Sequence, residues 1–182
     1  MEDLSLHILD IAENSIAAGA KTIEILVRED TVSDVLTVEV ADDGKGMDAK
    51  TAEKATEPFF TTRTTRRVGL GLAFLKEAAE ATNGSLRVES SPSHGTRVCA
   101  TFQLSHIDRK PLGNTAETIL TLLTNDSGVD VVYTRQYDNR NFVFDTREFL
   151  DHLHGMPLSS TASLKIIREF LKSEEHTVTN QA

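Results

Sequence analysis

Two hydrophobic periodicities alternate along the first 104 residues, and their order restricts the fold. Apolar residues recur at helical spacing over residues 3–18, whereas residues 22–28 and 35–41 alternate and are rich in β-branched side chains. The remaining segments are a short helix from 48 to about 56, a loop over 57–68, a helix over 70–81 and strands over 85–91 and 96–104. This order predicts an α/β (α+β) two-layer sandwich with helices on one face of a mixed sheet.

The pattern changes after residue 106. A polar linker over 108–111 precedes an expected helix over 112–123, a hairpin of strands over 129–137 and 142–145, and helices over 146–153 and 160–172, with a frayed tail over 176–182. About 70 residues fold only marginally alone. The sequence therefore predicts a first domain over 1–106 and a small α+β region over 107–182. We expect this region to pack against the first domain or against another chain.

Charge and composition exclude several classes of protein. The 182 residues hold 28 Asp and Glu against 19 Lys and Arg, and this net charge of −9 argues against nucleic-acid binding. The single cysteine, Cys99, excludes an intrachain disulfide and a Cys-rich zinc site. The sequence has no apolar run of about 18 residues and no signal-peptide pattern at its start, so we expect a cytoplasmic protein without a membrane segment.

The first helix carries polar side chains on one face. At about 100° per residue, His7, Asp10 and Asn14 fall within an arc of about 60°. The carboxylate and the carboxamide of Asp10 and Asn14 could hold a hydrated magnesium ion and orient a water. An ordinary solvated helix face has the same pattern. We interpret His7 as a helix-face or partly buried histidine, which could also pair with Asp10 and tune its pKa.

Two glycine-containing segments add further candidates. Asp42 ends a strand ahead of Gly44 and Gly46, so its carboxylate could accept a hydrogen bond from a purine amine while Gly46 lets the ring approach. The same residues are also typical of a hairpin turn. The segment 69–71 opens a helix, where free backbone N–H groups make an anion site, and Arg63, Arg66 and Arg67 before it add positive charge.

Taken in order, these segments resemble the motifs of the GHKL (Bergerat-fold) ATP-binding family, which includes gyrase B, the heat-shock chaperone ATPase, MutL and histidine kinases. Residues 10–20 resemble the N box in its MutL-like form, 42–47 the G1 box and 57–63 the F box of histidine kinases. Residues 69–72 resemble the G2 box, and Gly95-Thr96 is similar to the final Gly-Thr of that domain. The resemblance covers residues 1–106.

The resemblance implies a role for each matching position. Asn14 would ligate Mg²⁺, and Asp42 would bond the adenine amine of ATP with Thr96 nearby through water. Backbone N–H groups in the G2 box would bind phosphates, and residues 59–68 would form a mobile ATP lid. The full set of expected nucleotide-binding residues is Asn14, Asp42, Gly44, Gly46, Met47, Thr62, Arg63, Gly69, Leu70, Gly71, Leu72 and Thr96.

This sequence departs from the family pattern at two points. Asp10 stands where hydrolytic members usually carry the Glu that activates the nucleophile, so the candidate catalytic base is one methylene shorter. Glu13 points about 100° off that face and cannot replace it. We expect no phosphoacceptor histidine helix ahead of the domain. His152 lies in a segment that resembles the H box but lacks its acidic residue and follows the domain. We interpret that segment as a loop near a helix start.

Three functions remain open at this point. The preferred one is an ATP-dependent protein kinase in intracellular signalling, histidine-kinase-like or anti-sigma-kinase-like, whose acceptor is a separate protein bound through 107–182. The second is an ATP-driven switch or ATPase of MutL type that dimerises when ATP binds. The third is a nucleotide sensor in which Asp10 is too short to activate a nucleophile.

Overall fold

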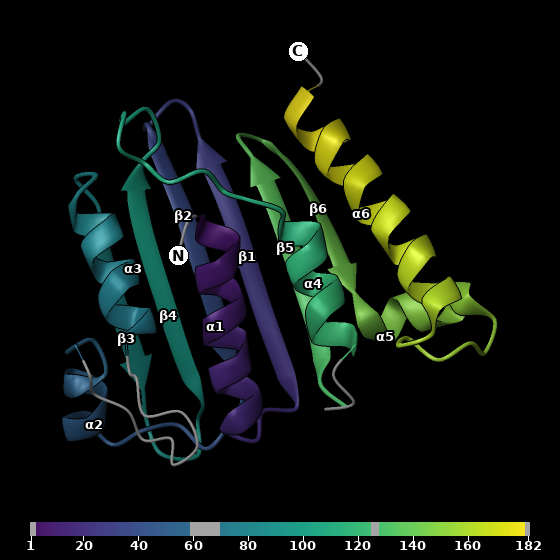
Figure 1. Ribbon diagram of the computed structural model, residues 1–182, viewed down its shortest axis with the longest axis horizontal. Coiled ribbons are helices and arrows are strands. Elements are labelled where there is room, and N and C mark those ends of the chain that lie inside the picture. The colour runs from purple at the N-terminus through teal and green to yellow at the C-terminus, as the bar shows by residue number, and fades with distance from the viewer. Residues whose placement is uncertain (1–2, 59–69, 125–127, 181–182) are drawn as a thin grey trace.

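The described part of the chain forms one sheet of six strands, and its helices gather on one side of this sheet (Figure 1). A computed structural model describes residues 3–58, 70–124 and 128–180. In sheet order the strands are β3 (Ser85–Ser90), β4 (Thr96–Gln103), β2 (Val35–Asp42), β1 (Thr22–Asp30), β5 (Asp130–Tyr137) and β6 (Arg140–Asp145). The helices are α1 (Leu4–Ala17), α2 (Ala49–Lys54), α3 (Gly71–Glu80), α4 (Thr115–Thr124), α5 (Thr146–Phe149), the 3₁₀ turn η1 (Leu150–Leu153) and α6 (Thr161–Asn180).

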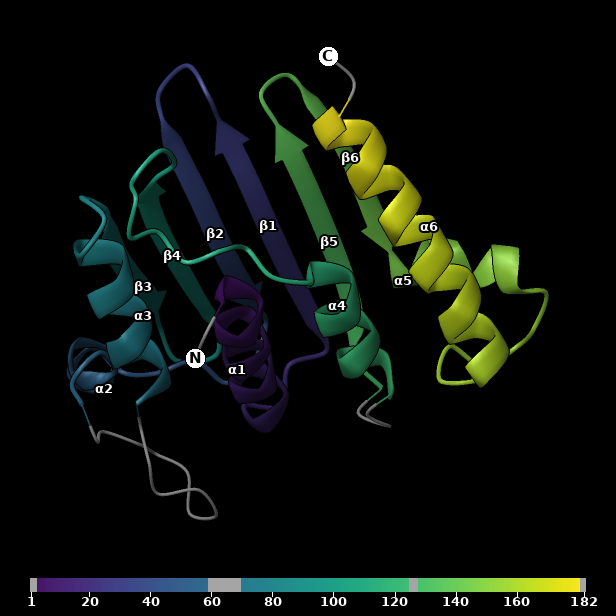
Figure 2. The same ribbon diagram turned by 45° about the horizontal axis from the view of Figure 1, so that its top comes forward.

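The two-layer sandwich expected from the sequence is confirmed. Helices α1, α3, α4 and α6 lie side by side over one face of the sheet (Figures 1 and 2). The sheet is mixed, because β1 pairs with β5 in parallel and all other neighbours are antiparallel. Alternate residues of β1, namely Ile23, Ile25 and Val27, are buried under the helices.

Helix α1 forms where the sequence predicts it. The Asp3 side chain caps the helix by accepting a hydrogen bond from the backbone N–H of Leu6 at 3.1 Å. Its apolar face, which includes Leu4, Ile8 and Ile11, is buried in the core. The helix ends before Gly19, whose φ of +77° suits glycine.

The sheet continues across the boundary expected after residue 106. Residue Ile23 of β1 lies opposite Val131 of β5, and α4 packs beside α1. The backbone N–H groups of Leu4 and Ser5 donate to the carbonyls of Pro111 and Leu112 at 3.0 and 2.8 Å. These carbonyls satisfy free N–H groups at the α1 N-terminus. Leu112, which the sequence places in a helix, lies outside α4, which begins only at Thr115.

The C-terminal helix is longer than predicted. The expectation of a helix ending at 172 and a frayed tail is wrong, because α6 continues to Asn180. The Tyr133 hydroxyl donates to Glu175 Oε1 at 2.7 Å, the Thr115 hydroxyl bonds the same oxygen, and Val178 is buried. These tertiary contacts order residues whose local sequence is polar. In the described part of the chain, no helix is both long and apolar enough to cross a bilayer.

Candidate functional site

Asp42 lies at the end of β2, and its carboxylate is held from two sides. The Ser15 hydroxyl of α1 donates to Asp42 Oδ2 at 2.7 Å, and the Gly44 N–H donates to Oδ1 at 2.9 Å. Each carboxylate oxygen has two lone pairs, so both can accept a further hydrogen bond. Asp42 is therefore a fixed acceptor where the sequence predicts an adenine contact. Ser15 was not predicted, although it directly follows Asn14.

The neighbouring carboxylate has a different task. Asp43 Oδ1 accepts from the backbone N–H groups of Lys21 and Thr22 at 2.7 and 3.0 Å, which ties the start of β1 to the end of β2. The Thr22 N–H, with a smaller contribution from that of Lys21, holds the pKa of the Asp43 carboxyl below its ordinary value. Asp43 thus stabilises the turn that positions Asp42.

Thr96 is the strand partner of Asp42, as the register of β2 and β4 shows. Its hydroxyl lies 2.9 Å from that of Ser90 on β3. Ser90 also accepts from the Met47 N–H at 2.8 Å and donates to the Gly95 carbonyl at 2.9 Å. Ser90, a second residue that the sequence did not reveal, therefore joins two expected site residues, Met47 and Thr96, to Gly95. Its only sequence signal is its place at the end of an alternating strand.

Two glycines allow the loops around Asp42 to pack closely. A Cβ on Gly46 would lie 2.0 Å from the Ser91 carbonyl oxygen, and one on Gly95 would lie 1.7 Å from the Asp42 carbonyl oxygen. Both residues have positive φ, +65° and +76°. A Cβ on Gly44 would lie 3.0 Å from Asp42 Oδ1, so this glycine leaves room for the carboxylate itself. These glycines thus let the backbone segments around Asp42 approach one another more closely than residues with a Cβ would allow.

Gly95→Ala should cost about 3 kcal/mol of unfolding free energy, because the new methyl group meets backbone atoms and the left-handed conformation adds strain. Gly155→Ala is the matched control. It has a similar φ of +85° but open space around the added Cβ, so it should cost only about 1 kcal/mol. Urea unfolding of the two variants measures the difference, and equal costs would contradict the close packing described here.

Asp10 and Asn14 lie at the junction of α1 and α3. The Asn14 side-chain nitrogen is 3.5 Å from Asp10 Oδ2, so the two residues share a face as predicted. A Cβ on Gly71 would lie 1.9 Å from the same Asp10 oxygen, which places the carboxylate against the first residue of α3. The N-cap residue of α3 is Leu70, whose side chain forms no hydrogen bond with the N–H groups of the first turn. Leu72 packs its side chain against the core.

The structure thus brings most predicted site residues into two groups along α1. Asp42, Gly44, Gly46, Met47 and Thr96 form one group, and Asp10, Asn14, Leu70 and Gly71 form the other. Ser15 contacts the first group and its neighbour Asn14 belongs to the second. The predicted residues Thr62, Arg63 and Gly69, and the expected lid over 59–68, lie outside the described residues.

His7 is more deeply buried than the sequence suggested. Its side chain is 1% exposed, and neither ring nitrogen has a hydrogen-bond partner among the described residues, so the alternative of a pairing with Asp10 does not form. Burial, with a smaller contribution from the charge of Lys110, lowers the pKa of His7 from 6.5 to about 4. The Gly71 backbone raises the pKa of His7, against the effect of burial. The His7 ring nitrogens nevertheless form no hydrogen bond with a described residue.

This pKa predicts a pH dependence of stability. The folded protein keeps His7 neutral down to about pH 4, whereas an unfolded chain protonates it below about pH 6.5, so the unfolded state binds more protons in between. Lowering the pH from 7 to 5 should therefore remove about 2 kcal/mol of stability. Urea unfolding at both pH values should show this loss in wild type and not in His7→Leu. A loss of the same size in both would show that His7 is not its source.

The site offers a magnesium ion few protein ligands. Among residues 3–58, 70–124 and 128–180, no group of three or more His, Cys, Asp or Glu side chains could hold a metal ion. The adjacent side chains of Asn14 and Asp10 nevertheless carry a carboxamide and a carboxylate oxygen, which suit Mg²⁺. This ion often keeps several waters and binds through one or two side chains together with substrate phosphates.

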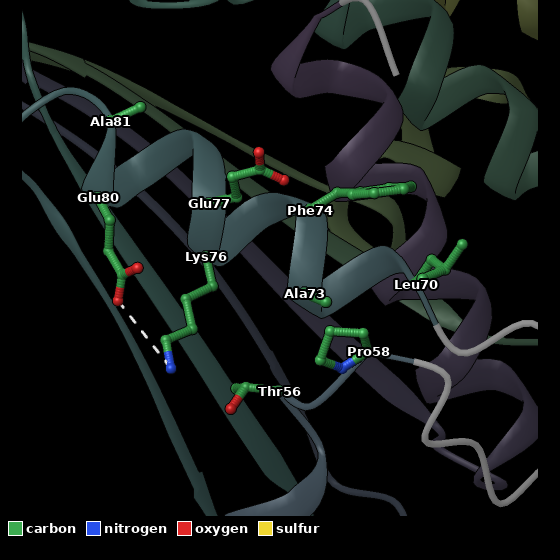
Figure 3. Close-up of a pocket in the computed structure, with 9 residues that line it drawn as sticks. All are labelled: Thr56, Pro58, Leu70, Ala73, Phe74, Lys76, Glu77, Glu80 and Ala81. Carbon is green, nitrogen blue, oxygen red and sulfur yellow. Dashed lines mark ion pairs between the residues drawn. The ribbon is translucent and has the colours of Figure 1, made fainter.

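A cavity of about 460 Å³ lies elsewhere, against α3 (Figure 3). Thr56 and Pro58 line one side of it, and Ala73, Phe74 and Lys76 are among the α3 residues on the other. At 100° per residue, its lining residues on α3 lie opposite the buried Leu75 and Ala79, so the cavity is on the solvent side of this helix. It does not contain the side chains of Asp10, Asn14 or Asp42.

Residues 2–106 are similar to a known protein family. The family described as "Histidine kinase-, DNA gyrase B-, and HSP90-like ATPase" matches residues 2–106. The sensor protein kinase FleS of Pseudomonas aeruginosa is 41% identical over 105 residues, which are 58% of this chain and 25% of that protein. The non-motile and phage-resistance protein of Caulobacter vibrioides is 32% identical over 112 residues, which are 57% of this chain and 13% of that protein. The match thus spans a quarter or less of each of these two relatives.

A crystal structure of the N-terminal domain of a DNA repair protein has the same fold. It superposes with a TM-score of 0.55 and 15% identity over 80% of this chain and 53% of that chain. Residues 2–106 thus form a histidine-kinase-like ATP-binding domain with the Bergerat fold. The chain belongs to the GHKL family.

Proposed function

We propose that this protein binds Mg-ATP between α1, the end of β2 and the start of α3, and transfers the terminal phosphate to a protein. The observation that carries the proposal is the arrangement along α1. Ser15 fixes the Asp42 carboxylate at one end, and Asp10 contacts Gly71 at the other. A single helix thus connects an acceptor for the adenine amine to a helix N-terminus suited to phosphates.

In the proposed complex, the Asp42 carboxylate accepts a hydrogen bond from the adenine amine, and Thr96 lies beside it to hold a bridging water. The first-turn N–H groups of α3 bind phosphate oxygens. Asn14 ligates Mg²⁺, which would neutralise charge on the phosphates. Asp10 accepts the proton of the attacking nucleophile, because it is the carboxylate at this junction.

We propose a separate protein as phosphate acceptor. His152, the one residue with a resemblance to an H box, lies in η1 and stacks on Phe149 with ring centroids 5.5 Å apart. Residues 146–153 follow β6, the edge strand farthest in sheet order from β3, whereas α3 covers β3 and β4 (Figure 1). His152 is therefore remote from the α1–α3 junction.

The proposal is tested with γ-labelled Mg-ATP and the purified chain alone, at protein concentrations that span about 100-fold. We expect slow release of free phosphate at a constant rate per chain and no label on the protein. A rate per chain that rises with concentration would instead support the ATP-driven switch, which acts as a dimer. Acid-labile label that disappears in His152→Gln would contradict a separate acceptor. The absence of both ATP binding and phosphate release would refute the proposal as a whole.

A further inference from the structure

His7 is a buried polar residue that the proposed reaction does not use. Neither ring nitrogen has a hydrogen-bond partner among the described residues, and the side chain is 1% exposed. A buried donor or acceptor without a partner destabilises a protein, typically by about 1–3 kcal/mol, so each such group calls for an explanation. An apolar side chain such as Leu would fill this place without that cost.

The surroundings of His7 point to the phosphate end of the site. His7 lies three residues before Asp10, about 60° from it around α1, and Asp10 contacts Gly71 at the start of α3. Helix α3 packs beside α1 (Figures 1 and 2). The Gly71 backbone raises the pKa of His7, although burial dominates and the net shift is downward. A backbone group has this effect when its carbonyl accepts from the ring, so the Gly71 carbonyl is the near neighbour.

The Gly71 carbonyl belongs to the same peptide unit as the Leu72 N–H. In a helix the carbonyl points toward the C-terminus and the N–H toward the N-terminus, where phosphates would bind. A carbonyl oxygen has two lone pairs, so this one can accept from the ring in addition to its bond within the helix. A hydrogen bond to the carbonyl also polarises the N–H on the other side of the peptide.

We propose that His7 is a positioning residue whose neutral ring donates to the Gly71 carbonyl when phosphates occupy the start of α3, and so fixes the Leu72 N–H toward them. The inference rests on the proposed function, because it requires ATP at this site. In the structure described here neither ring nitrogen forms a hydrogen bond with a described residue. The completed bond forms only with the ligand, and its contribution appears as ATP affinity.

The test compares His7→Leu and His7→Gln with wild type, using two ligands. Leu removes the donor, and Gln restores a side-chain N–H. We expect His7→Leu to bind Mg-ATP about tenfold more weakly, the effect of one hydrogen bond, and His7→Gln to stay within about threefold of wild type. Adenosine has no phosphate, so NMR titrations should give the same adenosine affinity for all three proteins.

The outcomes separate the two proposals. Unchanged ATP affinity in His7→Leu, or an equal loss for ATP and adenosine, would overturn the role of His7 while leaving ATP binding in place. Wild-type protein that binds no Mg-ATP would instead refute the proposed function. A second readout is the His7 ring ¹⁵N signal, assigned by its absence in His7→Gln. It should move to a hydrogen-bonded value with Mg-AMPPNP and not with adenosine, and an unmoved signal would contradict the inference.

Discussion

Asp10→Asn should lower the turnover of ATP at least about 100-fold and leave the affinity for Mg-ATP within about threefold. The substitution keeps the size of the side chain but removes its ability to take up a proton, and general-base catalysis is typically worth 10²–10⁴ in rate. Asp10 is the carboxylate that touches the first residue of α3, so no neighbouring side chain of α1 can replace it. Single-turnover phosphate release, with ATP binding measured separately, gives both numbers.

Glu13→Gln is the matched control. This variant makes the same carboxylate-to-amide change about one helical turn after Asp10. Glu13 points about 100° away from Asn14 around the helix, so it lies off the face that carries the site. Its turnover should equal that of wild type. If Asp10→Asn retains turnover, Asp10 is not the base. A wild type that binds ATP without any turnover would instead support the sensor function.

Asp42→Asn should weaken Mg-ATP binding about 100-fold, or about 3 kcal/mol. An amide nitrogen would face either the adenine amine, which is also a donor, or the Ser15 hydroxyl that now donates to Asp42. The variant should also lose preference for ATP over GTP, because guanine presents an acceptor where adenine presents the amine. Calorimetric titration with both nucleotides measures these effects.

Asp43→Asn controls for the change in charge. The Asn oxygen can still accept from the Lys21 and Thr22 N–H groups, both of which bond a single oxygen of Asp43. ATP affinity should therefore stay within about threefold, although the adjacent residue has lost the same charge. Equal losses in the two variants would show that net charge, and not a contact with adenine, determines the affinity.

The helical and strand periods of the sequence predicted most elements, because each depends on local pattern. The sequence also predicts Asp10, Asn14 and Asp42 as site residues, since their motifs are contiguous. Ser15 and Ser90 were missed because their roles arise from contacts across the fold: Ser15 meets a carboxylate 27 residues away, and Ser90 meets Met47 43 residues away. Residue spacing alone does not report which strands become neighbours.

The C-terminal region shows the same limit. The parallel pairing of Ile23 with Val131 is invisible to local patterns, and so is the bond from Tyr133 that orders the end of α6. The residues 176–182 were expected to fray because they are polar, yet tertiary contacts outweigh local propensity as far as Asn180. The sequence indicates only that His7 lies on a face of a helix. The deep burial of His7 is invisible to local pattern, because α3, which packs beside α1, begins 64 residues further along the chain.

The central claim is that nucleotide binds along α1 between Asp42 and Gly71. Amide chemical-shift mapping of the ¹⁵N-labelled chain with Mg-AMPPNP tests it most directly. We expect the largest changes at Ser15, Gly44, Gly71 and Thr96, on the two groups that α1 joins. Changes confined to Thr56, Phe74 and Lys76 around the outer cavity, or no changes at all, would contradict the account.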